Sequence, residues 1–114
     1  MNMRETANLI AKTLSDRKAR DITIIDISTK SSFADYFVNA TAGSSRQLGA
    51  LTQEVEEKLA ELALLPKSID GRPDTGWMLM DYGDIIVNVF NAETREKYAL
   101  DKIWGDCDIV KFED

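Results

Sequence analysis

The sequence predicts an α+β fold in which helices pack on a mixed five-stranded sheet, and three observations support it. Hydrophobic residues recur at helical spacing in two segments, near residues 3–16 and from residue 44 onward. Runs rich in β-branched and aromatic residues, typical of strands, lie between and after these helices. Two of these runs, 77–81 and 84–90, are joined by Tyr82-Gly83, which predicts a hairpin, so the sheet cannot be purely parallel.

The first helix is predicted over about residues 3–16. Asn2 and Glu5 have the spacing of a capping box at its start. A basic cluster at residues 17–20 follows, where a helix C-terminus favours cations. The hydrophobic stripe of this helix consists of Ala7, Ile10, Ala11 and Leu14.

The first two strands are predicted over residues 21–28 and 36–41. In the earlier strand, alternation places hydrophobic residues on both faces, which is typical of a strand covered on both sides. Ile22 and Ile24 share one face, and Ile25 and Ile27 share the other.

The second helix begins at Ser44, since Gln47 follows at capping-box spacing. Pro66 is expected to end it, because proline lacks the backbone N–H that a helix interior needs. Its stripe is formed by Leu48, Leu51, Val55, Leu59 and Leu62.

Ser68 and Ile69 are predicted as a short edge strand, followed by a loop over residues 70–76 that is rich in glycine and proline. The hairpin comes next. Its first strand, 77–81, is hydrophobic on both faces, so either a helix or a partner must cover the second face.

The C-terminal part is predicted as a short helix and a packed tail. Asn91 can cap this helix, with Glu93 in its first turn. The segment 109–112 is expected to pack as an extension. Hydrophobic anchors for the last helix are Tyr98, Leu100, Ile103 and Trp104.

The length of 114 residues suits one domain, 1–114, and composition restricts its location. No stretch of eighteen uncharged apolar residues is present, which excludes a membrane-spanning helix. The N-terminus reaches Arg4, Glu5 and Lys12 before an apolar run forms, so it lacks a secretory signal. We expect the protein in the cytoplasm.

The chain has no histidine and one cysteine, Cys107. A Ser-His-Asp or Cys-His site needs an imidazole base, and protein zinc sites draw on histidine or several thiolates. Neither site can be built from one copy of this chain, and an intramolecular disulfide is excluded as well.

Charge is unevenly distributed. The net charge is 14 − 20 = −6, and residues 1–20 carry five basic and two acidic groups, which leaves 9 − 18 = −9 on the remainder. Because nucleic-acid affinity depends on cations that neutralise phosphates, this acidic body is expected to avoid RNA and DNA and to attract a basic protein surface.

The segment Gly43-Ser44-Ser45 before the second helix offers an anion site and an alternative function. Strand, glycine, serine and helix are similar to the nucleotidyltransferase superfamily, in which paired acids on the next strand hold magnesium. Here Glu54 and Glu56 stand at that distance, but inside a helix and on different sides. The serines are therefore better explained as caps, although an enzyme using the Gly43-Ser44 loop stays an alternative.

Several short blocks then occur in a fixed order over nearly the whole chain. They are Asp35 to Val38, Ala40-Thr41, Gly43 to Gln47, Gly76-Trp77, Asp81 to Phe90 and Thr94 to Trp104. In this combination the chain resembles the Iojap family of ribosomal silencing factors (RsfS). Two positions depart from the family pattern: Asn88, where histidine is common, and Asp70-Gly71, where a glutamate-glycine pair is common.

The resemblance implies a translation repressor that is not an enzyme, needs no cofactor, and has a nucleotidyltransferase-like fold without the catalytic metal site. Such factors bind the fourteenth large-subunit ribosomal protein and sterically block joining of the ribosomal subunits, chiefly under nutrient limitation. The acidic body agrees with a basic protein partner and little direct nucleic-acid contact. Self-association through the hydrophobic strand, giving a homodimer when free, is a third hypothesis.

Carried onto this chain, the family interface predicts two groups of partner-binding residues. The first group lies on the hairpin, with Trp77 as central anchor, Leu79 and Met80 as apolar contacts, and Asp81, Tyr82 and Asp84 as polar partners. The second group is Arg95, Tyr98, Asp101 and Trp104. Acids at a reversal also form turns, and Arg95, Tyr98 and Trp104 have an alternative role in internal packing.

Overall fold

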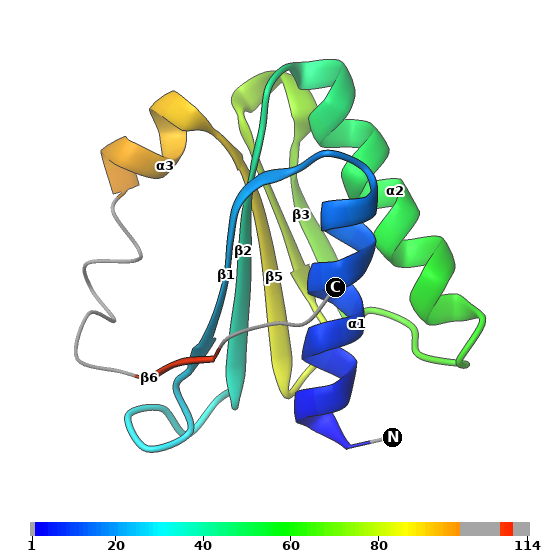
Figure 1. Cartoon of the computed structure of the whole chain (residues 1–114), viewed down its shortest axis with the longest axis vertical. Coiled ribbons are helices and arrows are strands. Elements are labelled where there is room, and N and C mark those ends of the chain that lie inside the picture. The colour runs from blue at the N-terminus through cyan, green and yellow to red at the C-terminus, as the bar shows by residue number, and fades with distance from the viewer. Residues whose placement is uncertain (1, 99–107, 111–114) are drawn as a thin grey trace.

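In the residues that the computed structural model describes, 2–98 and 108–110, three α-helices surround a six-stranded sheet (Figure 1). The helices are α1 (Met3–Asp16), α2 (Ser45–Ala60) and α3 (Ala92–Tyr98). The strands are β1 (Arg20–Asp26), β2 (Tyr36–Ala42), β3 (Ser68–Arg72), β4 (Trp77–Asp81), β5 (Ile85–Asn91) and β6 (Asp108–Val110). All five predicted strands are present, and the short β6 lies beside β1 at the edge.

The sheet has the order β3-β4-β5-β2-β1-β6 and is mixed, as predicted. Its central pair, β2 and β5, is parallel, whereas every other neighbouring pair is antiparallel. β4 and β5 form the predicted hairpin. The fold class is therefore confirmed.

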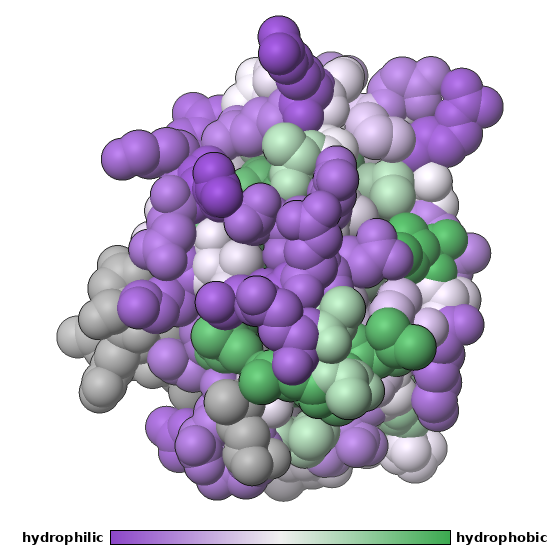
Figure 2. Space-filling view, turned by 90° about the vertical axis from the view of Figure 1, so that its right-hand side faces the viewer, coloured by the Kyte–Doolittle hydropathy of each residue, from purple (hydrophilic) through white to green (hydrophobic). Residues whose placement is uncertain are grey.

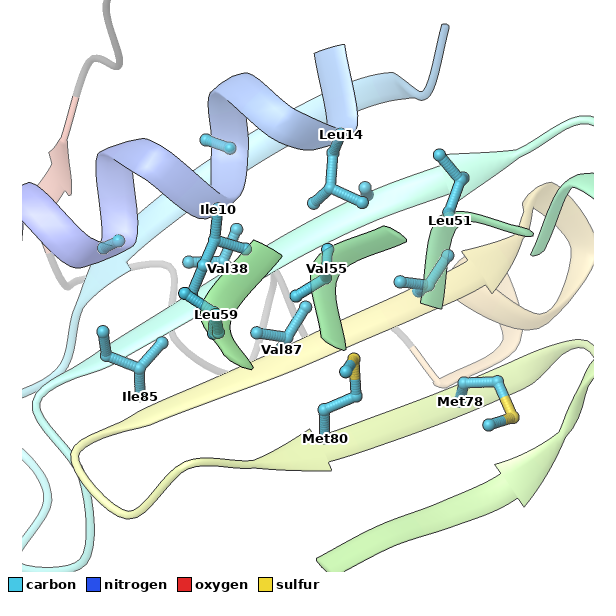
Figure 3. Packing of buried hydrophobic residues seen from close by; sticks show 14 of the residues in the cluster. Ile10, Leu14, Val38, Leu51, Val55, Leu59, Met78, Met80, Ile85 and Val87 are labelled. Atoms are coloured by element: carbon cyan, nitrogen blue, oxygen red, sulfur yellow. The ribbon is translucent and has the colours of Figure 1, made fainter. Parts of the chain in front are cut away.

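The main core lies between the sheet and two helices. Figure 1 shows α1 and α2 on one side of the sheet, which we call the helix face, and α3 on the other side, the α3 face. Figure 3 shows Ile10 beside Val38 and Val55 beside Val87 of the central strands. Burial of each such side chain stabilises the fold by roughly 1.5–3 kcal/mol, which makes this layer the main source of stability.

The α3 face carries a second, smaller cluster. Ile25 and Ile27 of β1 and the following loop are buried there with Phe37 and Ile86, while Ile24 is buried on the helix face. The prediction that this part of the chain is covered on both sides is confirmed. Leu79 of β4 packs against this second cluster and is partly exposed.

The predicted caps of the two long helices are present and hold these helices in place. The side chain of Asn2 accepts a hydrogen bond from the Glu5 N–H at 2.8 Å, and that of Ser44 accepts one from the Gln47 N–H at 3.0 Å. The Gln47 amide donates to the carbonyls of Arg17 and Lys18 at 3.3 and 3.2 Å. One side chain thus joins the start of α2 to the end of α1.

The predicted end of α2 is wrong. The helix ends at Ala60 rather than near Pro66, and Leu62 lies outside it with 43% of its surface exposed. Ala63 adopts a left-handed conformation with φ 59°, and the Leu64 N–H donates to the Leu59 carbonyl at 2.9 Å. The left-handed residue that ends a helix in this way is usually glycine. Because alanine stands at this position, nothing in the sequence indicated that the helix ends here.

The predicted loop over residues 70–76 is also partly wrong, because β3 continues through Arg72. Gly71 of β3 pairs with Met78 of β4 and has φ 95°. A Cβ at Gly71 would lie 2.2 Å from the Trp77 carbonyl oxygen, so glycine permits the strand to approach closely. A single turn of 3-10 helix, Pro73–Thr75, and Gly76 separate β3 from β4.

The outer surface of the two long helices is mostly hydrophilic. Figure 2 shows this side with hydrophilic side chains over most of its area and hydrophobic ones gathered in the lower part. Leu62 and Leu65, in the segment after α2, are 43% and 73% exposed. Among the described residues, no helix combines the length and hydrophobicity required to span a bilayer.

Candidate protein-binding groove

A groove of about 520 Å³ opens between β3, the start of β4 and α3. Its hydrophobic floor consists of Trp77 and Leu79, both partly exposed. The remaining lining is largely polar and acidic: Asp70, Gly71, Asp74, Thr75, Asn91, Glu93, Thr94 and Lys97. Tryptophan is enriched among the residues that contribute most to protein–protein binding, so this groove is a candidate protein-binding site.

Strand alternation explains why Trp77 and Leu79 share this groove. Trp77 pairs with Phe90 and Leu79 with Asn88, so all four side chains lie on the α3 face. The Trp77 and Phe90 rings lie 5.3 Å apart at an angle of 31°. The indole is therefore supported from within the sheet while part of it faces the groove.

The entrance to β4 depends on Gly76. This residue has φ 84°, and its carbonyl accepts a hydrogen bond from the Asn91 N–H at 2.9 Å. A Cβ at Gly76 would lie 2.3 Å from the side-chain nitrogen Nδ2 of Asn91 and 2.6 Å from the Thr94 hydroxyl oxygen. The absence of a side chain at Gly76 lets α3 begin directly beside the groove.

Three carboxylates, those of Asp70, Asp74 and Glu93, and one ammonium, that of Lys97, line the groove, so its lining carries a net negative charge. The Arg72 guanidinium donates two hydrogen bonds to Asp74, at 2.9 and 3.2 Å. These bonds hold the pKa of Asp74 below its ordinary value, so this carboxylate stays charged at neutral pH. The groove therefore favours a cationic surface.

Met80 of β4 and Tyr82, just after this strand, pack against the helix-face core and away from the groove, and for Met80 the structure corrects the prediction. Met80 is fully buried under α2, as Figure 3 shows, because neighbouring residues of a strand point to opposite faces. Leu79 and Met80 therefore cannot contact one partner together. Tyr82 also packs against the helix-face core, and its enclosed hydroxyl is not available as a polar contact.

Burial gives Tyr82 an unusual titration. Desolvation, with a smaller contribution from Glu56, raises the pKa of Tyr82 to about 12. Its hydroxyl finds no hydrogen-bond partner in the described part of the chain. The folded state thus favours the neutral phenol, and its stabilising contribution is complete below pH 10 and is lost as the pH rises through about 12.

We expect Tyr82→Phe to leave stability at pH 7 unchanged or to raise it by up to about 1 kcal/mol, because it removes a buried, unpaired hydroxyl. The decline in stability above pH 10 should become shallower, since one group that ionises more readily in the unfolded chain is gone. Urea unfolding at pH 7 and pH 11 measures both effects. A loss of more than about 1 kcal/mol at pH 7 would reveal a hydrogen bond of this hydroxyl.

Asp81 and Asp84 lie near the hairpin turn, away from the groove lining. The Asp81 carboxylate accepts a hydrogen bond from the Gly83 N–H at 2.8 Å, which is the turn-forming role weighed in the sequence. Asp84 is exposed, and its backbone carbonyl accepts from the Asp35 and Tyr36 N–H groups at 2.7 and 3.1 Å. Their partner contacts stay predictions.

Arg95 on α3 forms an internal network. Its guanidinium donates to the Thr41 hydroxyl at 2.9 Å, to the Thr23 hydroxyl at 3.3 Å and to the Asp21 carbonyl. These bonds tie α3 to β1 and β2, in agreement with the internal role considered above. Tyr98 is the last residue of α3. Asp101 and Trp104 lie outside the described residues.

The sequence prediction missed several residues around Trp77. Asp70 and Glu93 line the groove, but no local pattern connects them, because β3 and α3 meet only in the folded chain. Asn39 and Asn88, fully buried on the α3 face, carried a signal that could have been used. An asparagine amid valines and alanine in a central strand must find a buried hydrogen-bond partner.

The alternative site at Gly43-Ser44 is engaged in helix capping. Ser44 caps α2, and the Gly43 N–H donates to the Gln47 side chain. Glu54 pairs with Arg17 at 2.9 Å. Among residues 2–98 and 108–110, no group of three or more acidic, histidine or cysteine side chains could hold a metal ion.

The sequence matches the family described as "Ribosomal silencing factor during starvation" over residues 1–114. The ribosomal silencing factor RsfS of Bacillus subtilis (strain 168) is 32% identical over 110 residues, covering 96% of this chain and 93% of that protein. A Mus musculus protein named "Mitochondrial assembly of ribosomal large subunit protein 1" is 28% identical over 100 residues, covering 85% of this chain and 44% of that protein.

A solved structure has the same fold. The crystal structure of a Chromobacterium violaceum protein matches with a TM-score of 0.88 and 32% identity, covering 92% of this chain and 88% of that one.

Proposed function

Because the chain belongs to the family of ribosomal silencing factors, a family of ribosome-associated translation regulators, we propose that it represses translation by binding the fourteenth protein of the large ribosomal subunit and blocking subunit joining. Binding occurs through the groove, and repression acts chiefly under nutrient limitation. The action is steric and requires no cofactor. It takes place where the ribosomes are, in the cytoplasm.

The observation that carries this proposal is a partly exposed tryptophan on the floor of an acidic groove. Trp77 and Leu79 supply apolar area that a partner can desolvate, and three carboxylates line the same groove. Central aromatic anchors contribute most of the binding free energy of an interface, while surrounding charges raise the association rate and select the partner.

Electrostatics favours a protein target over ribosomal RNA. The chain carries a net charge of −6, and three carboxylates line the groove. Such a surface is repelled by phosphates and attracted by the basic residues typical of ribosomal proteins. An exposed basic protein on the large subunit satisfies both conditions.

The size of the protein is sufficient for a steric block. Its extents are 33 × 33 × 27 Å. Contacts between two docked surfaces need atoms within about 4 Å of each other. A folded body of this thickness on the joining face of the large subunit keeps the small subunit from making such contacts over the area it covers.

Gradient sedimentation with purified ribosomal subunits tests the proposal. We expect the protein to migrate with free large subunits, to be absent from joined ribosomes, and to reduce subunit joining in a dose-dependent manner. Binding should weaken when ionic strength rises from about 0.1 M to 1 M, since the Debye length falls from about 10 to 3 Å. Full subunit joining at a saturating dose of folded protein would contradict the proposal.

A further inference from the structure

A buried polar ladder crosses the α3 face behind the groove. Asn39 of β2 and Asn88 of β5 are 0% and 1% exposed and stand opposite each other in the parallel register. Asn88 also stands opposite Leu79 of β4, two pairs along from the pair of Trp77 and Phe90 and on the same face of the sheet. Burying a side-chain amide costs free energy unless the amide is hydrogen bonded, so both asparagines need partners within the fold.

A chain of two hydrogen bonds, in which each side chain donates to the next, joins Trp77 to Asn88 and Asn88 to Asn39. The Trp77 indole N–H donates to the Asn88 side-chain oxygen at 3.0 Å, and the Asn88 amide nitrogen donates to the Asn39 side-chain oxygen at 3.0 Å. An indole nitrogen can only donate, so it fixes which end of the Asn88 amide faces Trp77. The other end is then necessarily a donor toward Asn39.

This arrangement restrains the indole. If the Trp77 ring rotated away from Asn88, a buried amide oxygen would lose its partner, which typically costs about 1–3 kcal/mol. The Phe90 ring, 5.3 Å from that of Trp77, supports the same orientation. An anchor already held in its binding orientation loses less side-chain entropy when a partner docks.

We infer that Asn88 is a positioning residue that holds the Trp77 indole in the orientation a partner binds. The inference rests on the proposed function for its effect on affinity, but its structural part, an indole N–H bonded to Asn88, stands independently. Asn88 itself is buried, so it acts on the docked protein only through its hydrogen bond with Trp77.

The test compares Asn88→Leu with the matched variant Asn39→Leu, using bacterial large ribosomal subunits as the probe. Both variants replace a buried amide by an apolar side chain of similar volume, but only Asn88→Leu removes the acceptor of the indole. We expect about tenfold weaker binding for Asn88→Leu and a change within about twofold for Asn39→Leu, per folded protein.

A double variant separates positioning from general support of the sheet. Trp77→Phe keeps an aromatic ring but lacks the N–H, so adding Asn88→Leu to it should cause no further loss of affinity. A loss of the same size in both backgrounds would overturn the inference. Wild-type affinity of folded Asn88→Leu would overturn it as well.

NMR of the indole N–H provides a readout that needs neither the ribosome nor a stable Asn88 variant. In the wild-type protein, the Trp77 indole signal, assigned by its absence from Trp77→Phe, should be protected from solvent exchange. Rapid exchange of this signal would overturn the inference. If protection is found but the wild type does not bind large subunits, the proposed function fails and the held indole stands.

Discussion

Replacing Trp77 by alanine is expected to weaken binding to the large ribosomal subunit by about 2 kcal/mol, roughly a 30-fold loss of affinity. The indole is the largest side chain on the groove floor and is only partly buried, so much of its apolar area is available to a partner. Co-sedimentation at several protein concentrations, with the fold checked by circular dichroism, measures the change.

Leu65→Ala is the matched control for Trp77→Ala. Leu65 is 73% exposed and lies in the segment after α2, away from the groove lining, so its truncation should leave affinity unchanged. Undiminished binding of folded Trp77→Ala would remove this residue from the interface. Light scattering of both variants beside the wild type also shows whether the hydrophobic strand serves self-association, because a homodimer through Trp77 would dissociate only in Trp77→Ala.

The second large effect is expected from Met80→Ala, which should lower the free energy of unfolding by about 3 kcal/mol. Met80 is fully buried between the sheet and α2, and its truncation leaves a cavity in the main core. For a domain of ordinary stability, about 5–15 kcal/mol, this is a large fraction of the total. Denaturant unfolding measures the loss.

Leu79→Ala provides the complementary result. Leu79 is only partly buried and faces the groove, so we expect a loss of about 1 kcal/mol in stability but about tenfold weaker binding. Met80→Ala should bind normally per folded protein. If Met80→Ala instead weakened binding while retaining full stability, the assignment of the two faces of β4 would be wrong.

Local signals in the sequence predicted most of the elements. The caps at Asn2 and Ser44 and the stripes of α1 and α2 depend on residues within a few positions of one another, and all are present in the structure except Leu62, which lies beyond the end of α2. The hairpin was predicted for the same reason, since Gly83 permits the turn with φ 89°. The error at the end of α2 arose because the left-handed residue that follows this helix is Ala63 and not the usual glycine.

The site was predicted less completely than the fold. The sequence indicated the hydrophobic strand around Trp77, but it included Met80, because the run is hydrophobic on both faces and alternation alone does not say which face a helix covers. The packing of α2 against Met78 and Met80 decided that question. The sequence left Arg95 with two roles, partner contact and internal packing. Its hydrogen bonds to Thr23 and Thr41 show that it has the internal role.

By itself, the sequence determined the α+β class, the acidic character, the family resemblance and the position of the hydrophobic hairpin strand, because these depend on composition and on neighbours along the chain. Only the tertiary structure decided that Trp77 and Leu79 face a groove with Asp70 and Glu93, and that Asn88 holds the indole. These groups come from β3, β4, β5 and α3 and approach one another only through strand pairing and packing, which leave no periodic trace in the sequence.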